Sequence, residues 1–296
     1  SDLWYQRGTT LVGDDDSTIR GFGSSIGCSV TGPHYLNRLV VGSDSGHVRV
    51  YRFSWLSGTV PEWQRLDGGL LDPDPDSNPG KAVVAMAGSG VRFAVSYPSL
   101  GKVSLYRFID EETIDEASSR PNFELVTEMY SETDDDDMFG QSLSVDIFAN
   151  FVVVGAKGYV RAYWLRVSPS SLASYKFAPA GDKIIGEESD GEEFGSVVAS
   201  GRVPHHSGCV ACPFVLDKQR IAISSPAYDN GRGRVLLYQY NEDETSWQPL
   251  ASPIEGEVAG EGMGYTVRIS PDMGSVATSS SFGEVKTFRI QPLQRQ

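Results

Sequence analysis

The amino-acid sequence predicts an all-β protein, a single five-bladed β-propeller with four-stranded antiparallel blades. The first observation is a strand motif that reads glycine, any residue, valine, and closes on an aromatic residue. It occurs five times, at 46–51, 101–106, 158–163, 233–238 and 283–288. The second observation is its spacing, because the closing aromatic residues lie 55, 57, 75 and 50 residues apart, and such periods are typical of propeller blades. The third is the glycine content, 32 of 296 residues, which suits a fold with many tight turns.

Three other segments recur with this motif, so each repeat predicts a four-stranded blade. The first strand is rich in small residues, as the crowded centre of a propeller requires, and is expected at 22–30, 79–87, 139–147, 194–202 and 263–271. The second strand is expected at 38–43, 92–97, 151–156, 220–225 and 275–280. The glycine motif is the third strand. The fourth begins at an aromatic residue, namely Trp4, Trp63, Phe123, Tyr175 or Trp247.

The two ends of the chain indicate how the ring closes. The chain opens on a fourth strand at Trp4 and its last repeat ends on a third strand at Phe288. We expect the N-terminal strand to complete the last blade, because closure removes an exposed sheet edge. This organisation predicts one domain over residues 1–296. The chain begins at Ser1 with no apolar leader, which we interpret as a processed or trimmed chain.

The net charge excludes one class of partner. The chain has 25 Lys and Arg against 39 Asp and Glu, a formal net charge of −14. Such an acidic surface repels phosphate backbones, so nucleic-acid binding is not expected. No apolar run is long enough for a membrane-spanning helix.

The repeat motifs resemble those of a known family. Phe-Gly opens the first strand at 22–23, 139–140 and 194–195, Val-Gly or Ile-Ser lies in the second strand, and Gly-x-Val-x-x-Tyr forms the third. This pattern resembles the FG-GAP repeat of integrin-α-type propellers and its secreted, Trp-punctuated microalgal versions. The resemblance implies a propeller used for binding or as a scaffold, outside the cell or in an organelle lumen. The family usually has seven blades, whereas this chain supplies five.

The metal sites of that family do not carry over to this chain. In the family, calcium is bound by a DxDxDG-type loop between the first and second strands. Here those loops read SVTGPHYLNR, AGSGVR, DIFANF and SPDMGS, which lack the ladder of acidic residues.

Acidic residues gather in the connections from each fourth strand to the next first strand. These connections hold 18 of the 39 acidic residues, and all of them should lie on one face, around the mouth of the propeller axis. The sequence therefore predicts a ring of negative potential that attracts a basic protein surface, another protein or glycan partner, or Ca²⁺. The alternative is that these are ordinary solvated turn residues. The candidate binding residues are Asp14, Asp15, Asp16, Asp134, Asp135, Asp136, Asp137, Glu192, Glu193 and Glu261.

One connection has the spacing of calcium ligands. Asp72, Asp74, Asp76 and Asn78 place oxygen atoms at alternate positions, as the start of a Ca²⁺ loop does. Position twelve is Val83 where such a loop has glutamate, and the prolines stiffen the segment. A rigid acidic turn is the alternative to a Ca²⁺ site.

Blade 4 carries an insertion at about 201–219. It contains His205, His206, Cys209 and Cys212. A local disulfide or two free thiols are expected at the cysteine pair, and a Zn²⁺ site is the less favoured alternative. The third cysteine, Cys28, is expected to be a small core residue on a first strand.

The sequence favours a non-enzymatic binding or scaffold module. It contains no Gly-x-Ser-x-Gly, phosphate-loop or His-Glu-x-x-His motif. The alternative is a carbohydrate-active hydrolase, which needs two carboxylates facing the axial pocket. The first strands offer only Asp146, while Asp137, Glu193 and Glu261 flank the expected mouth.

Overall fold

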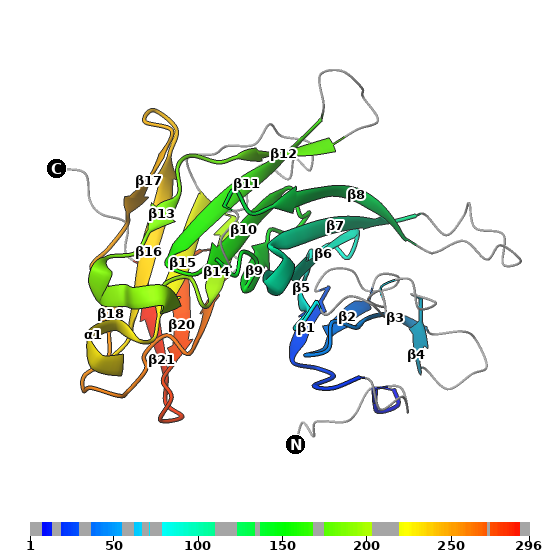
Figure 1. Ribbon diagram of the computed structural model, residues 1–296, viewed down its shortest axis with the longest axis horizontal. Helices are drawn as coiled ribbons and strands as arrows, with labels where there is room; N and C mark the ends of the chain where they lie inside the picture. The colour runs from blue at the N-terminus through cyan, green and yellow to red at the C-terminus, as the bar shows by residue number, and fades with distance from the viewer. Residues whose placement is uncertain are drawn as a thin grey trace, which may run out of the picture. The chain divides into compact units, whose positions relative to one another are not determined.

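A computed structural model of the chain is almost entirely β (Figure 1). The chain divides into two compact units, Ser1–Tyr130 and Ser131–Gln296, each described here by itself. The structure describes residues 8–13, 19–29, 37–54, 62–66, 71, 79–109, 123–133, 137–167, 175–202, 219–270 and 273–290.

The first unit contains the sheets of blades 1 and 2, each with four antiparallel strands in sequence order. The blade-1 sheet consists of β1 (Ser25–Cys28), β2 (Arg38–Gly42), β3 (Val48–Ser54) and β4 (Glu62–Arg65). The blade-2 sheet consists of β5 (Val83–Met86), β6 (Arg92–Tyr97), β7 (Lys102–Phe108) and β8 (Phe123–Tyr130), with a 3₁₀ turn at Pro98–Leu100.

The second unit contains the sheets of blades 3, 4 and 5. Blade 3 has β9 (Ser142–Val145), β10 (Phe151–Ala156), β11 (Tyr159–Val167) and β12 (Tyr175–Pro179), and β13 (Ile184–Ile185) also pairs with β11. Blade 4 has β14 (Val198–Arg202), β15 (Gln219–Ser225), β16 (Arg234–Asn241) and β17 (Ser246–Pro249), and β18 (Ile254–Glu255) also pairs with β16. Within the described residues, blade 5 has β19 (Thr266–Ile269), β20 (Ser275–Ser279) and β21 (Val285–Arg289).

The strand predictions are confirmed wherever the structure describes the chain. All five expected first, second and third strands are present, in the expected order within each sheet. Fourth strands contain Trp63, Phe123, Tyr175 and Trp247. The expected strand at Trp4 lies outside the described residues.

The register adds one detail to the fourth strands. Trp63, Phe123 and Trp247 each pair with the residue seven positions after the motif glycine of the third strand. In blade 3 that position is Leu165, and its partner is Phe177 rather than Tyr175. Strand β12 begins at Tyr175, as predicted, and the aromatic residue opposite this position lies two residues further on, on the same face of the strand.

The Phe-Gly motif has a physical cause at its glycine. Gly140 and Gly195 have φ values of 97° and 86°, in the left-handed region that glycine adopts without strain. A Cβ on Gly195 would lie 2.8 Å from the carbonyl oxygen of Tyr159. The preceding Phe139 and Phe194 are each only 1% exposed, so the motif turns the chain and anchors it in the core.

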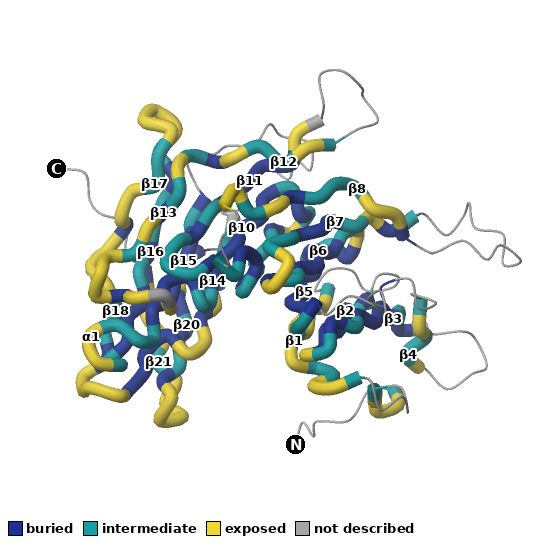
Figure 2. Tube along the Cα trace, in the orientation of Figure 1, coloured by how far each residue is buried: buried dark blue, intermediate teal, exposed yellow. Residues whose placement is uncertain are grey.

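Within each unit a hydrophobic core lies between successive sheets, and Figure 2 colours the buried segments dark blue. Val40 and Val50 of blade 1 pack with Val84, Phe93 and Val95 of blade 2. First strands of successive blades contact each other within each unit, as β1 does with β5 and β14 with β19. Such contact is what the small residues of the first strands predicted.

The expectation that Cys28 is a core residue is wrong, because its thiol is free and exposed. Side chains of β1 alternate between faces, and Ile26 and Cys28 occupy the exposed one. Their counterparts on β5, Val84 and Met86, are buried against blade 1. Within the first unit, the blade-1 sheet has a neighbouring sheet on one face only, so the small size of Cys28 did not decide its burial.

No helix among the described residues is long and apolar enough to cross a bilayer. The single-domain organisation over 1–296 stays a prediction.

Candidate binding surface on the connection face

One end of the second unit gathers the connections that lead into blades 3, 4 and 5. We call it the connection face; it also includes the turns between second and third strands. Backbone hydrogen bonds join these segments, from Gly158 N–H to the Phe194 carbonyl at 3.2 Å and from Gly262 N–H to the Gly231 carbonyl at 2.7 Å. The face comprises 131–133, 137–141, 156–158, 183–197, 226–233, 254–265 and 280–284.

Asp137 fixes the connection that leads into blade 3. Its Oδ2 accepts hydrogen bonds from the hydroxyls of Ser131 (2.6 Å), Thr133 (2.8 Å) and Tyr159 (2.6 Å), and its Oδ1 accepts one from the Phe139 N–H (3.0 Å). Burial opposes ionisation, but these four donors outweigh it and lower the pKa of Asp137. Burial and the hydrogen bond to Asp137 raise the pKa of Tyr159, so Tyr159 keeps its proton at neutral pH.

Asp190 fixes the connection that leads into blade 4, where it lies in the 3₁₀ helix η3 (Glu188–Glu193). Arg234 Nε donates to Asp190 Oδ1 at 2.7 Å, and Arg234 Nη2 donates to Oδ2 at 2.6 Å. The Asp190 side chain is fully buried and that of Arg234 is 5% exposed. The Glu187 N–H also donates to Asp190 Oδ2, at 2.8 Å. Arg234 Nη2 also donates to Glu187 Oε2 at 2.9 Å, and the guanidinium lies 4.0 Å from the centre of the Tyr228 ring.

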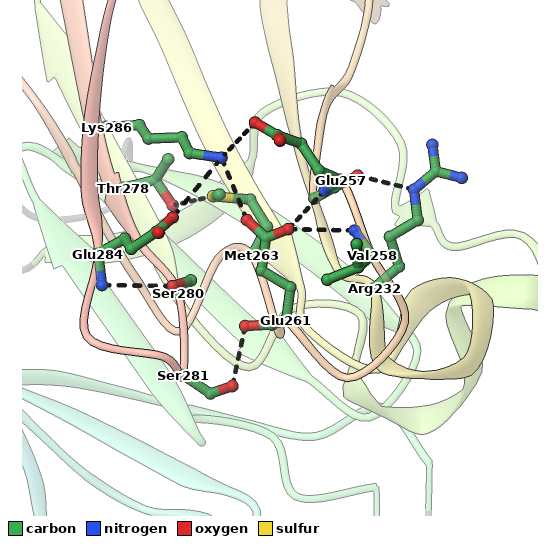
Figure 3. Close-up of polar contacts among 11 residues, drawn as sticks. Arg232, Glu257, Val258, Glu261, Met263, Thr278, Ser280, Ser281, Glu284 and Lys286 are labelled. Atoms are coloured by element: carbon green, nitrogen blue, oxygen red, sulfur yellow. Dashed lines mark hydrogen bonds and ion pairs between the residues drawn. The ribbon is translucent and has the colours of Figure 1, made fainter.

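Glu261 fixes the connection that leads into blade 5 (Figure 3). Its Oε2 accepts backbone N–H groups of Glu257 and Val258, and its Oε1 lies 3.2 Å from Lys286 Nζ. Hydrogen bonds from those N–H groups and from Lys286 lower the pKa of Glu261. Lys286 also lies 3.1 Å from Glu257 and 3.9 Å from Glu284, so one ammonium faces three carboxylates.

The three connections therefore share one arrangement. A buried or half-buried carboxylate in the connection accepts a hydrogen bond from a side chain on the third strand of the blade that follows. The pairs are Asp137 with Tyr159, Asp190 with Arg234, and Glu261 with Lys286. Each pair anchors a connection to its sheet, which explains why acidic residues recur there.

Other acidic residues of the connection face are exposed to solvent. On η3 and its flank these are Glu187, Glu188 and Glu193, and on the next connection Glu257. Of the predicted binding residues, Glu193 is therefore exposed, Asp137 and Glu261 are used internally, and Glu192 lies on η3. Asp190 was not among the predicted binding residues, although the capping spacing from Glu187 to Asp190 was a signal for it.

The other predicted site residues lie outside the described residues. Among the described residues no group of three or more His, Cys, Asp or Glu side chains is arranged to hold a metal ion. The residues not described are Asp14, Asp15, Asp16, Asp72, Asp74, Asp76, Asn78, Asp134, Asp135, Asp136, His205, His206, Cys209 and Cys212.

Asp146, the acidic residue of the first strands, lies in a turn. Its Oδ1 accepts the N–H of Asn150 at 2.7 Å and of Phe151 at 3.3 Å, and the side chain is buried. It thereby shapes the tight turn between β9 and β10. This role is one that short acidic side chains commonly have in turns.

No family model matches this chain, and no curated protein matches it. Among solved structures, it is similar to the β-propeller domain of Cps50 (Swd1) from Myceliophteria thermophila, with a TM-score of 0.52 and 11% identity over 86% of this chain and 67% of that one. It is also similar to a protein from Lactobacillus plantarum, with a TM-score of 0.51 and 10% identity over 88% and 69%. These similarities show the fold: the chain is a β-propeller, and the five sheets are its blades.

Proposed function

We propose that this protein is a non-enzymatic binding module whose connection face binds a basic segment of a partner protein. The proposal is based on a difference among the acidic residues of that face: some anchor the connections, and others are exposed to solvent. Asp137, Asp190 and Glu261 anchor the connections, while Glu188 and Glu193 are exposed on them. Glu187 and Glu257 are exposed as well, although Glu187 also pairs with Arg234 and Glu257 with Lys286. Carboxylates held on anchored loops attract cations and lose little conformational entropy when a partner binds.

The hydrolase alternative has less support on this face. A glycosidase needs one carboxylic acid that keeps its proton near neutral pH, beside a second carboxylate. Asp137 and Glu261 have lowered pKa values, and both are occupied by internal donors. Lys286 has a raised pKa because of its hydrogen bonds to Glu257 and Glu261, so it remains an ammonium rather than a nucleophilic amine.

We also propose a protein family and a cellular compartment for this protein. The positive φ values of the Phe-Gly glycines and the burial of Phe139 and Phe194 support membership of the FG-GAP repeat family. An extracellular or organelle-lumenal location would follow from the secreted relatives that the repeats resemble. In such a compartment Cys209 and Cys212 would form a local disulfide, which a mass measurement with and without reductant tests. Stoichiometric zinc in the purified protein would contradict the disulfide.

Salt-dependent binding tests the proposed function. The probe is a nonalysine peptide, and the test variant is E188Q/E193Q/E257Q, which removes three exposed carboxylates from the connection face. The matched control, E242Q/D243N/E244Q, removes exposed acidic residues from the turn between β16 and β17, at the opposite end of the blade-4 sheet. We expect wild type and control to bind with affinity that falls steeply as salt rises, and the test variant to bind at least about tenfold more weakly.

Two results would overturn the proposal. One is equal loss of binding in the test and control variants, which would mean that net charge alone attracts the peptide. The other is binding that does not change with salt. Binding of neutral oligosaccharides with no peptide binding would instead favour a glycan ligand.

A further inference from the structure

Two aromatic side chains on the blade-5 part of the connection face are exposed. Tyr265 is 64% exposed and Phe282 is 61% exposed. Both adjoin the same short loop: the Tyr265 N–H donates to the Gly262 carbonyl at 3.2 Å, and the Ser281 N–H, next to Phe282, donates to the Glu261 carbonyl at 2.9 Å. The two rings therefore flank one anchored segment.

The surrounding core does not need these rings. Met263 and Val267, two residues before and after Tyr265, are fully buried, whereas Tyr265 itself is exposed, so its ring is not part of the core around them. Val258, in the neighbouring connection, is also exposed, at 55%. Single exposed apolar residues are ordinary, but three around one hydrogen-bonded loop form a patch of the kind that marks interaction sites.

Negative charge surrounds this patch. Glu257 is next to Val258 in the sequence and Glu284 is two residues after Phe282; both are exposed, and Glu261 is buried. Lys286 is the ammonium at their centre, held charged by its hydrogen bonds to Glu257 and Glu261, as its raised pKa indicates. Three carboxylates around one ammonium leave a net negative charge (Figure 3).

We propose that this patch, made of Val258, Tyr265, Phe282, Glu257 and Glu284, binds an arginine side chain on an extended segment of a partner protein. The proposal rests on the proposed function and names the side chain that anchors the basic segment. The carboxylates of the patch attract a cation. The exposed rings favour a cation with a flat, weakly hydrated face, because such a face can stack on them. Guanidinium has such a face and can pair with carboxylates through two hydrogen bonds, whereas a lysine ammonium is compact and strongly hydrated.

The test compares a peptide of alternating arginine and glycine with its lysine counterpart, by calorimetry at the same salt concentration for both peptides, repeated at several salt concentrations. The test variant is Y265A/F282A. The control variant is Y130A, which removes an exposed tyrosine at the end of β8 in the first unit. We expect wild type and Y130A to bind the arginine peptide at least about fivefold more tightly than the lysine peptide. Y265A/F282A should lose that preference, while its salt dependence and unfolding temperature stay unchanged.

The outcomes separate this inference from the proposed function. If E188Q/E193Q/E257Q weakens binding but Y265A/F282A keeps the arginine preference, the connection face binds cations and the aromatic patch is not the anchor. If wild type binds both peptides equally, the inference is also overturned. If wild type binds neither peptide, the inference and the proposed function both fail.

Discussion

Asp190 and Arg234 show what a buried ion pair requires in this protein. Two hydrogen bonds join them, the Glu187 N–H satisfies the carboxylate further, and the Tyr228 ring covers the guanidinium. Taking both charges out of water costs several kcal/mol, which good geometry offsets. The pair therefore holds η3 in position but adds little to the net free energy of unfolding.

Removing one member of this pair should be costly. R234M leaves the buried Asp190 carboxylate without its cation, and we expect a loss of about 3–5 kcal/mol in the free energy of unfolding. R234M/D190L, which removes both charges, should lose clearly less than R234M alone. Urea denaturation followed by tryptophan fluorescence measures both. A double variant as unstable as the sum of the two single variants would show that the residues act independently.

Glu261 should make stability depend on pH. Its folded-state pKa is lowered from an ordinary value of 4.5, so its contribution is present above pH 4.5 and is lost as the pH falls through the lower folded-state pKa. E261Q should therefore be less stable than wild type at pH 7 and should lose less stability on acidification. Thermal melts at pH 7, 5, 4 and 3 give the comparison. Parallel pH profiles for the two proteins would contradict it.

At the scale of elements, an arginine at the start of the second strand joins one blade to the next. Arg38 donates from Nη1 to the Gly90 carbonyl at 2.8 Å, and Arg220 donates from Nη1 to the Met273 carbonyl at 2.8 Å. Both carbonyls belong to the tight turn between first and second strands of the following blade. Gly90 and Met273 both have positive φ, at 73° and 57°, so the two turns have the same shape.

Blade 3 lacks this arginine, and its neighbour explains the difference. In blades 1 and 4 this arginine pairs with the sixth residue after the motif glycine. In blade 3 the residue that pairs with that position is Phe151. In the following blade the tight turn is replaced by the long connection 203–218 between β14 and β15. The arginine is thus present in blades 1 and 4, where the next blade has a tight turn between its first and second strands. It is absent from blade 3, where the next blade has a long connection instead.

Loss of Arg220 should weaken the contact between blades 4 and 5. R220M removes the hydrogen bonds to the Met273 carbonyl and to Gln239, and we expect a loss of about 1.5–3 kcal/mol, because hydrogen bonds from charged groups are worth this much. R289M, at an exposed arginine of β21, is the control and should change stability by less than about 0.5 kcal/mol. Equal effects in chemical denaturation would refute the role of Arg220.

At the scale of the whole molecule, the register of the fourth strands makes ring closure testable. In blades 1 to 4 the residue seven positions after the motif glycine pairs with an aromatic residue; the pairs are Phe53–Trp63, Phe108–Phe123, Leu165–Phe177 and Tyr240–Trp247. In blade 5 that position is Ile290. If the N-terminal strand completes blade 5, Trp4 should lie opposite Ile290.

A cysteine pair tests this closure. W4C/I290C should form a disulfide under mild oxidation, detected by mass spectrometry of tryptic peptides, and should raise the unfolding temperature. W4C/V285C is the control, because five residues along a strand is about 17 Å, too far for a disulfide. Cross-linking of both pairs to the same extent, or of neither, would show that the N-terminal strand does not pair there.

The sequence by itself determined the blades. Alternating strands, turn glycines and aromatic closing residues are local patterns, and steric limits on the backbone convert them directly into strands and turns. The same patterns placed the first strands beside one another, because only small residues allow that approach. The recurring acidic residues were also visible, as were the arginines at the start of 38–43, 92–97 and 220–225.

Only the tertiary structure decided what those charged residues do. Asp190 and Glu193 lie on one short 3₁₀ helix, yet one is buried against Arg234 and the other is exposed. Cys28 was small enough for a core and is nevertheless exposed, and it is Phe177 of β12 that lies opposite Leu165. Burial and pairing depend on which residue from a distant strand arrives opposite. The packing of whole sheets decides which distant residue lies opposite, so the local sequence does not predict the burial or the pairing.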